Sequence, residues 1–224
     1  MSLFCLVHGS TQNPSGWALL VPVLQQQGHE TVLADLPVDQ PEASATVYAQ
    51  AIATAIPKGR DDSIVVAHSA SGLFLPLVPE LRQVHRLVFL AAVIPQIGKS
   101  LMDQTKADLP MFNPEWIGKD PTKSEELARQ FLFHDCSDDV ARWAWSTMRL
   151  MFARGALIET CPLRDWPDIP CSYVVCADDR TLKPEWCRRT ARARLGVDAI
   201  ELPGGHCPHV SRPRELAALL AALD

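Results

Sequence analysis

Short runs of apolar, often β-branched residues alternate with longer segments of helical periodicity along most of the chain. The runs typical of buried strands are residues 2–8, 29–37, 63–68, 86–95, 171–179 and 199–204. The segments between them predict helices over 14–28, 43–57, about 70–80, 184–196 and 211–223. Strands that alternate with helices predict a mostly parallel sheet of about six strands, covered by helices on both faces.

This alternation stops between Gln96 and Pro167, where no clear strand is visible. The stretch instead holds amphipathic segments at 125–135 and 137–155. A loop of ~70 residues without structure of its own is uncommon in a compact domain. We therefore expect an inserted helical cap at 96–166, with residues 1–95 and 167–224 forming an α/β core.

Composition excludes several classes of protein. The chain has 224 residues, 47% of them apolar, and a net charge of −5 without a basic block, which argues against binding to nucleic acid. No apolar run approaches the length of a membrane span, and the N-terminus lacks the basic region of a signal peptide. The seven cysteines are scattered without a C-x-x-C, as in a reduced, cytoplasmic protein.

Neither a cofactor nor a metal is expected. There is no G-x-G-x-x-G after a strand and no G-x-x-x-x-G-K-[ST]. The run His206-Cys207-Pro208-His209 contains three possible zinc ligands, but it includes a proline and has no partner cluster.

Polar residues follow several of the predicted strands. The sequences at these points are His8-Gly9-Ser10, residues 68–72 (HSASG), residues 177–180 (ADDR) and residues 204–206 (GGH). Ligands of open parallel sheets bind outside this edge. A serine becomes a good nucleophile when a neutral imidazole takes its proton, a carboxylate orients the imidazole and N–H groups receive the oxyanion. Each residue alone is typical of a helix cap or a turn, but together, in the order Ser…Asp…His, they favour a triad.

Sterics distinguish the two serines of AHSASG. A nucleophile in a tight strand-to-helix turn needs small residues two positions before and after it. Ser69 has Ala67 and Ser71 in these positions, whereas Ser71 has Leu73, which is too large. Ser69 is therefore the predicted nucleophile. Asp178 and Asp179 both remain candidates for the acid on this reasoning.

Over nearly its whole length the chain resembles the α/β-hydrolase superfamily, in particular the branch of plant methylesterases and hydroxynitrile lyases with their bacterial relatives. The resemblance rests on CLVHGS…GW at 5–17, VLADLP at 32–37, VVAHSASG at 65–72, RLVFLAAVIP at 86–95, YVVCADDRTLKPEW at 173–186 and ELPGGHCPHVSRP at 201–213. It implies an α/β-hydrolase fold with a small helical cap.

The resemblance also assigns roles to individual residues. It implies Ser69 as nucleophile, His206 as base and Asp179 as acid, with Asp178 as the alternative, because Cys176 stands at the glycine of a G-x-x-D pattern. The backbone N–H groups of Ser10 and Ala70 correspond to the oxyanion hole, and Gly9 is expected beside the substrate. The elbow departs from G-x-S-x-G at both glycines.

Residues 134–149 resemble the caps of bacterial members of this branch. Five cap residues are therefore predicted to line an apolar substrate pocket: Phe131, Phe133, Trp143, Trp145 and Met148. The alternative is that they form the interior of the cap itself. His68 recurs beside the nucleophile in this superfamily with its side chain pointing away from the reaction, and His209 is a candidate structural residue.

The leading functional hypothesis is a serine hydrolase of small, largely apolar carboxylic esters. A C–C lyase of the hydroxynitrile type is the second, but those enzymes place a lysine after the triad histidine, where this chain has Cys207, and a threonine where it has Gly9. The third is a ligand-binding protein without catalytic activity on the same fold. The resemblance also implies a homodimer.

Overall fold

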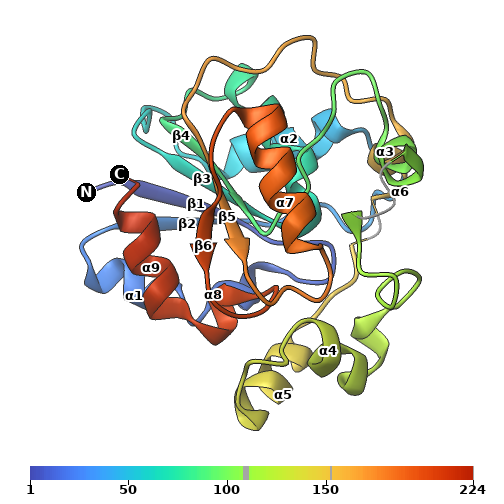
Figure 1. Ribbon diagram of the computed structural model, residues 1–224. Coiled ribbons are helices and arrows are strands. Elements are labelled where there is room, and N and C mark those ends of the chain that lie inside the picture. Colours follow the sequence, from blue (N-terminus) through green and yellow to red (C-terminus); the bar gives the residue numbers. More distant parts are fainter. Residues whose placement is uncertain (108–110, 152, 224) are drawn as a thin grey trace.

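The computed structural model describes residues 1–107, 111–151 and 153–223. Its centre is a sheet of six strands in the order β2-β1-β3-β4-β5-β6, and all neighbouring strands are parallel (Figure 1). The strands are β1 (Leu3–Val7), β2 (Glu30–Ala34), β3 (Ile64–His68), β4 (Arg86–Leu90), β5 (Cys171–Cys176) and β6 (Ile200–Leu202). The predicted fold class is confirmed.

Helices cover both faces of the sheet. On one face lie α1 (Val21–Gln26) and α9 (Pro213–Ala221), which follows the short α8 (Pro208–Ser211), and on the other lie α2 (Ala45–Ala55) and α7 (Pro184–Thr190) (Figure 1). Alternate residues of β1 supply the two cores: Phe4 and Leu6 belong to the cluster under α1 and α9, and Cys5 and Val7 to the cluster under α2. Strands buried on both faces explain the continuous apolar runs of the sequence.

Several helices are shorter than their apolar pattern predicts. The segment expected as a helix over 70–80 forms two 3₁₀ turns, Ser69–Leu73 and Leu75–Glu80. Pro76 and Pro79 lack the N–H that a continuous helix would need at these positions. The segment 14–28 is similarly divided into a 3₁₀ turn at Pro14–Trp17 and α1.

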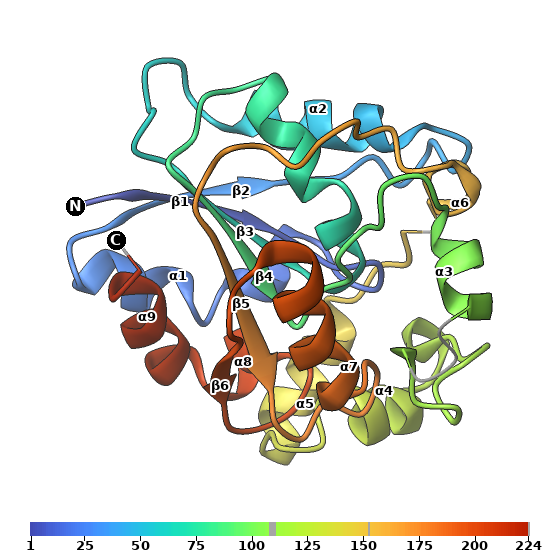
Figure 2. The ribbon, with the colours of Figure 1, turned by 45° about the horizontal axis from the view of Figure 1, so that its top comes forward.

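The segment between β4 and β5 contains α3 (Leu101–Ala107), α4 (Glu125–Phe131), α5 (Asp138–Ser146) and α6 (Arg154–Ile158). Figure 2 shows α4 and α5 on one side of this segment and α3 and α6 on another. The described part of the segment adds no strand to the sheet; an isolated antiparallel bridge joins Phe112 to Leu182. The boundaries of the cap, 96–166, stay a prediction.

In the described part of the chain, no helix is both long enough and apolar enough to traverse a lipid bilayer.

The strand order reverses direction at β1, which lies between β2 and β3. The connections after β1 and β3 therefore leave the sheet on opposite sides and create a crevice beyond their carboxyl ends, where ligands bind in folds of this kind. Ser10 follows β1 and Ser69 follows β3, so the topology brings these two residues to the crevice.

Candidate active site

Ser69 occupies a sharp turn directly after β3. Its φ of +58° is in the left-handed region, which a residue with a side chain adopts only when its surroundings impose it. The carbonyl of Ser69 accepts a hydrogen bond from the N–H of Val93 at 2.9 Å. A Cβ on Gly72 would lie 2.2 Å from the carbonyl oxygen of Val93, so the close approach of these two segments requires a glycine there.

A chain of hydrogen bonds joins Ser69, His206 and Asp179. The hydroxyl of Ser69 lies 3.0 Å from Nε2 of His206, and Nδ1 of the same ring lies 2.7 Å from Oδ2 of Asp179. The side chains of His206 and Asp179 are 4% and 1% exposed. This arrangement allows the ring to accept the serine proton at Nε2 while the carboxylate holds Nδ1–H.

Asp178, the alternative acid, is turned elsewhere. Its carboxylate accepts a hydrogen bond from the N–H of Gly204 at 3.2 Å, and its own N–H donates to the carbonyl of Gly204 at 3.0 Å. The two aspartates therefore make different contacts. Asp178 joins the loop after β5 to the loop after β6, whereas Asp179 contacts the imidazole of His206.

Thr181 also belongs to this chain of hydrogen bonds, and the sequence reasoning missed it. Its hydroxyl lies 3.0 Å from Oδ1 of Asp179 and 2.8 Å from Nδ1 of His206. The N–H groups of Thr181 and Leu182 donate to the same Oδ1 at 2.7 and 3.1 Å. An Asp followed two residues later by a Thr is typical of a turn closed by the aspartate, and this was the available signal.

The backbone N–H groups of Ser10 and Ala70 lie in the two segments that meet at the crevice. Among the turn, loop and cap hydrogen bonds of the described residues, neither N–H is used as a donor. Carbonyls of the loop after β1 are held instead: the carbonyl of Ser10 accepts from the N–H of Met151 at 2.6 Å, and the carbonyl of His8 accepts from the hydroxyl of Ser71. The Ser71 side chain thus ties the turn of Ser69 to the loop of Ser10.

Gly9 allows these segments to approach one another. A Cβ at this position would lie 3.0 Å from both Nδ1 of His68 and Cβ of Ser69. Gly9 packs against the nucleophile turn and is not among the residues that line the cavity. Its packing explains why a glycine stands there, and its contact with substrate stays a prediction.

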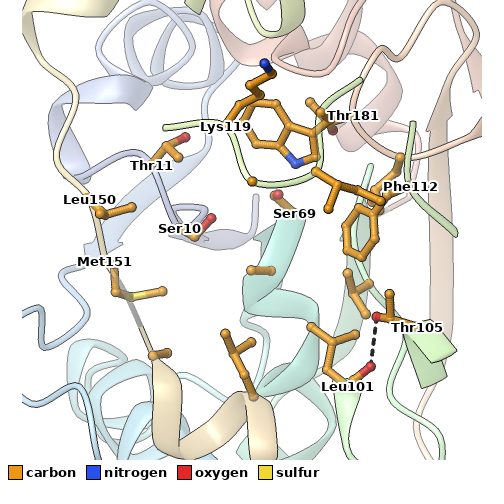
Figure 3. A pocket seen from close by; sticks show the side chains of 18 of the residues that line it. Ser10, Thr11, Ser69, Leu101, Thr105, Phe112, Lys119, Leu150, Met151 and Thr181 are labelled. Carbon is orange, nitrogen blue, oxygen red and sulfur yellow. Dashed lines mark hydrogen bonds between the residues drawn. The ribbon is translucent and has the colours of Figure 1, made fainter. Parts of the chain in front are cut away.

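A cavity of about 370 Å³ opens over Ser69 (Figure 3). Besides Ser69, Ser10 and Ala70, its walls come chiefly from described residues of the segment between β4 and β5, which lie within 101–105, 112–119, 150–151 and 153–157. The residues concerned are Leu101, Thr105, Phe112, Trp116, Ile117, Gly118, Lys119, Leu150, Met151, Ala153 and Leu157; Thr11, Phe74, Val93, Thr181 and Leu182 complete the lining. A mostly apolar cavity with a few hydroxyl groups is typical of a site for a small organic molecule.

The five cap residues that were predicted to line the pocket lie elsewhere. Phe131, Phe133, Trp143, Trp145 and Met148 pack in a separate cluster with Ala128, Ala141, Cys207 and Val210, and none of the five lines the cavity over Ser69. The apolar faces of α4 and α5 are covered by each other and by the start of α8, which removes them from the substrate side. That these five residues line a substrate pocket stays a prediction, and the alternative, that they form the interior of this helical unit, agrees with their packing.

Three further histidines are buried beneath the site. Nε2–H of His68 donates to the carbonyl of His206 at 2.8 Å, which fixes the loop that carries the imidazole. Burial, followed by the neighbouring His206 and His209, lowers the pKa of His68 well below its ordinary value. Burial also lowers the pKa of His8 and lowers that of His209 to about 3. All three rings are therefore neutral near pH 7.

Comparisons with known proteins agree with this geometry. Residues 6–219 match the pattern of the alpha/beta hydrolase family. The alpha/beta hydrolase nvfD of Aspergillus novofumigatus is 27% identical, over 93% of this chain and 90% of that protein, and a probable hydrolase, R7, of a Phoma species is 26% identical over 97% and 96%.

Solved structures show the same fold. Polyneuridine aldehyde esterase superimposes with a TM-score of 0.78 at 22% identity, over 100% of this chain and 99% of that one. A methylesterase from Arabidopsis gives a TM-score of 0.75 at 18% identity, over 100% and 98%. With the family pattern matched over almost the whole length and the serine, histidine and aspartate hydrogen-bonded at the strand ends, the chain belongs to the α/β-hydrolase family.

Proposed function

We propose that the protein is a serine hydrolase that cleaves small, largely apolar carboxylic esters. The observation that carries the proposal is the continuous chain of hydrogen bonds from the hydroxyl of Ser69 through both ring nitrogens of His206 to Asp179, at the floor of an apolar cavity. This geometry provides a nucleophile, a base and an orienting carboxylate in one place.

In the proposed mechanism the hydroxyl oxygen of Ser69 attacks the ester carbonyl carbon while Nε2 of His206 takes its proton. The N–H groups of Ser10 and Ala70 stabilise the oxyanion. The imidazolium then gives the proton to the leaving alkoxide, which departs as the alcohol and leaves an acyl-enzyme. Water, deprotonated by the same nitrogen, hydrolyses this acyl-enzyme and regenerates Ser69. Asp179 and Thr181 hold the ring throughout.

The residue after His206 favours hydrolysis over cyanohydrin cleavage. Cys207 is buried, and burial raises the pKa of its thiol well above the ordinary value, so it stays neutral. Its sulfur lies 3.4 Å from Nε2 of Gln12 and contributes to packing. A lysine in this place would supply a positive charge that stabilises cyanide, whereas a neutral thiol supplies none.

The test combines turnover with covalent labelling. We expect a fluorophosphonate probe to label the protein at Ser69, and Ser69→Ala to lose the label and on the order of 10⁶-fold in kcat for p-nitrophenyl acetate. Ser146→Ala, which removes an exposed hydroxyl on α5, serves as the matched control and should keep both. Near wild-type turnover by Ser69→Ala, or a label mapped by peptide mass spectrometry to Ser71, would contradict the assignment.

A further inference from the structure

The walls of the cavity over Ser69 carry an unbalanced charge. Its described lining residues are apolar or bear hydroxyl groups, with one exception: Lys119 contributes a cation, and none of the lining residues is an aspartate or glutamate. The chain as a whole has a net charge of −5, so a cavity whose only charged lining residue, among those that the structure describes, is a lysine differs from the average surface.

Lys119 lies on a tight turn at the rim of this cavity. Its N–H donates to the carbonyl of Trp116 at 3.0 Å, and Gly118 adopts a φ of +77° between them. Ile117, in the same turn, is 58% exposed and also lines the cavity. An exposed apolar residue beside a cation at a cavity mouth suits a ligand that is partly apolar and partly anionic.

The rim turn is tied to the loop that carries the acid. The N–H of Asn113 donates to the carbonyl of Thr181 at 2.8 Å, its side-chain amide donates to the carbonyl of Arg180 at 3.0 Å, and the N–H of Lys183 donates to the carbonyl of Met111 at 3.0 Å. Arg180, Thr181 and Lys183 follow Asp179 in the chain. The backbone that leads into the turn at 116–119 is therefore held at a fixed position relative to the loop of Asp179.

The ammonium of Lys119 is available to a ligand. The side chain is exposed, and no ion pair joins it to any carboxylate among the residues that the structure describes. The adjacent Asp120 is bonded instead to Lys123 at 3.1 Å. Figure 3 shows Lys119 above Ser69 with its nitrogen directed away from it, and Leu101, Thr105 and Met151 on the opposite side of Ser69.

We propose that the favoured substrates are esters that carry a carboxylate several bonds from the scissile carbonyl. The apolar part of such an ester would lie in the cavity beside Leu101 and Met151, and its carboxylate would lie at Lys119. This inference rests on the proposed esterase function and names its substrate class. The separation follows from the geometry, because the ammonium lies at the rim and not at the reacting atoms. The attraction exists before and during the reaction, so it should act mainly through KM.

The test uses two matched pairs of probes. The first is the p-nitrophenyl monoester of adipic acid against the same monoester of adipamic acid, which places the charge on the acyl side. The second is para-butanoyloxybenzoate against para-butanoyloxybenzamide, which places it on the alcohol side. The quantity measured is the ratio of kcat/KM for the carboxylate to that for the amide, taken within each variant so that differences in folded fraction cancel.

In at least one pair, Lys119→Gln should lower this ratio by about threefold to tenfold, the size expected of one partly exposed ion pair. Lys119→Glu should lower it further, and added salt should lower it in the wild type only. Lys58→Gln is the matched control: it removes the same charge from an exposed loop between α2 and β3. This loop precedes β3, whereas Ser69 follows the carboxyl end of the same strand, so the ratio should stay unchanged.

The outcomes separate the two proposals. If the amides are hydrolysed but Lys119→Gln and wild type have equal ratios for both pairs, the substrate inference is overturned and the esterase proposal stands. If none of the four probes is hydrolysed and the fluorophosphonate does not label Ser69, the esterase proposal itself fails.

Discussion

The loops that follow the strands and the segment inserted between β4 and β5 contribute to the same cavity in different ways. The loops present hydroxyl, imidazole and carboxylate groups that are buried and hydrogen-bonded to one another, such as His206 and Asp179. The inserted segment presents mostly apolar walls, some of them open to solvent, such as Leu150 at 43% exposure. The difference is consistent with the proposed function: the groups proposed for the chemistry lie at the carboxyl ends of the strands, and the walls proposed to select the substrate come chiefly from the insertion.

The strongest test of this division compares the two adjacent aspartates. Asp179→Asn keeps the shape but leaves an amide that cannot hold the required tautomer of His206, so kcat should fall by about 10⁴-fold. Asp178→Asn keeps an acceptor for the N–H of Gly204 and should change kcat by less than about threefold, as expected of a conservative change in a turn. Steady-state kinetics on p-nitrophenyl acetate measures both; equal losses would break the distinction between the two residues.

The second test concerns the buried histidines under the strand ends. Their pKa values are lowered in the folded protein, whereas the unfolded chain binds protons near pH 6.5. The unfolded state therefore holds more protons as the pH falls below 6.5, and folding stability is lost in that direction. His8, His68 and His209 all act in this direction, and each ring that stays neutral in the folded protein adds up to about 1.4 kcal/mol per pH unit to the slope.

Urea unfolding between pH 7.5 and 5 checks this slope, in a range above the titration of ordinary carboxylates. His209→Gln should reduce the slope by about 1.4 kcal/mol per pH unit, because one group that titrates only in the unfolded state is removed. A stability independent of pH in this range would show that the three rings do not stay neutral in the folded protein.

The smallest of these effects is expected at Thr181, where the two regions meet. Its carbonyl accepts from Asn113 of the insertion and its hydroxyl contacts Asp179 and His206. Thr181→Val should lower kcat by about tenfold with little change in KM, since one hydrogen bond to a charged group is lost. Thr181→Ser, which restores the hydroxyl, should recover most of the rate. A fall in melting temperature without a change in kcat would indicate a structural role only.

The strand-end residues could be predicted from the sequence because the three types occur together after apolar runs and in an informative order. Ser69 and His206 each follow an apolar run, β3 and β6 in the structure, and small flanks distinguish Ser69 from Ser71. Asp179 was chosen over Asp178 only through resemblance, and the contact with His206 now gives a physical reason for the choice. Parallel strands with helices on both faces followed from the same alternation.

The cavity walls could not be found in this way. An apolar residue that faces a cavity, such as Met151 or Leu157, has the same character as one that faces the core, and the insertion has no alternation that orders it. The prediction for the five cap residues within 131–148 rests on resemblance to other caps, and in the structure these side chains pack in a cluster of their own. The helix predicted over 70–80 follows from the apolar pattern alone, whereas Pro76 and Pro79 divide this segment into two 3₁₀ turns.

The hydrogen bond between Ser71 and the carbonyl of His8 has a thermodynamic consequence. It connects residues 63 positions apart in the chain and joins the turn of Ser69 to the loop of Ser10. The proposed oxyanion donors are therefore oriented before any ester arrives. The entropy loss of aligning these dipoles is incurred once, when the chain folds, and is not repeated in each turnover.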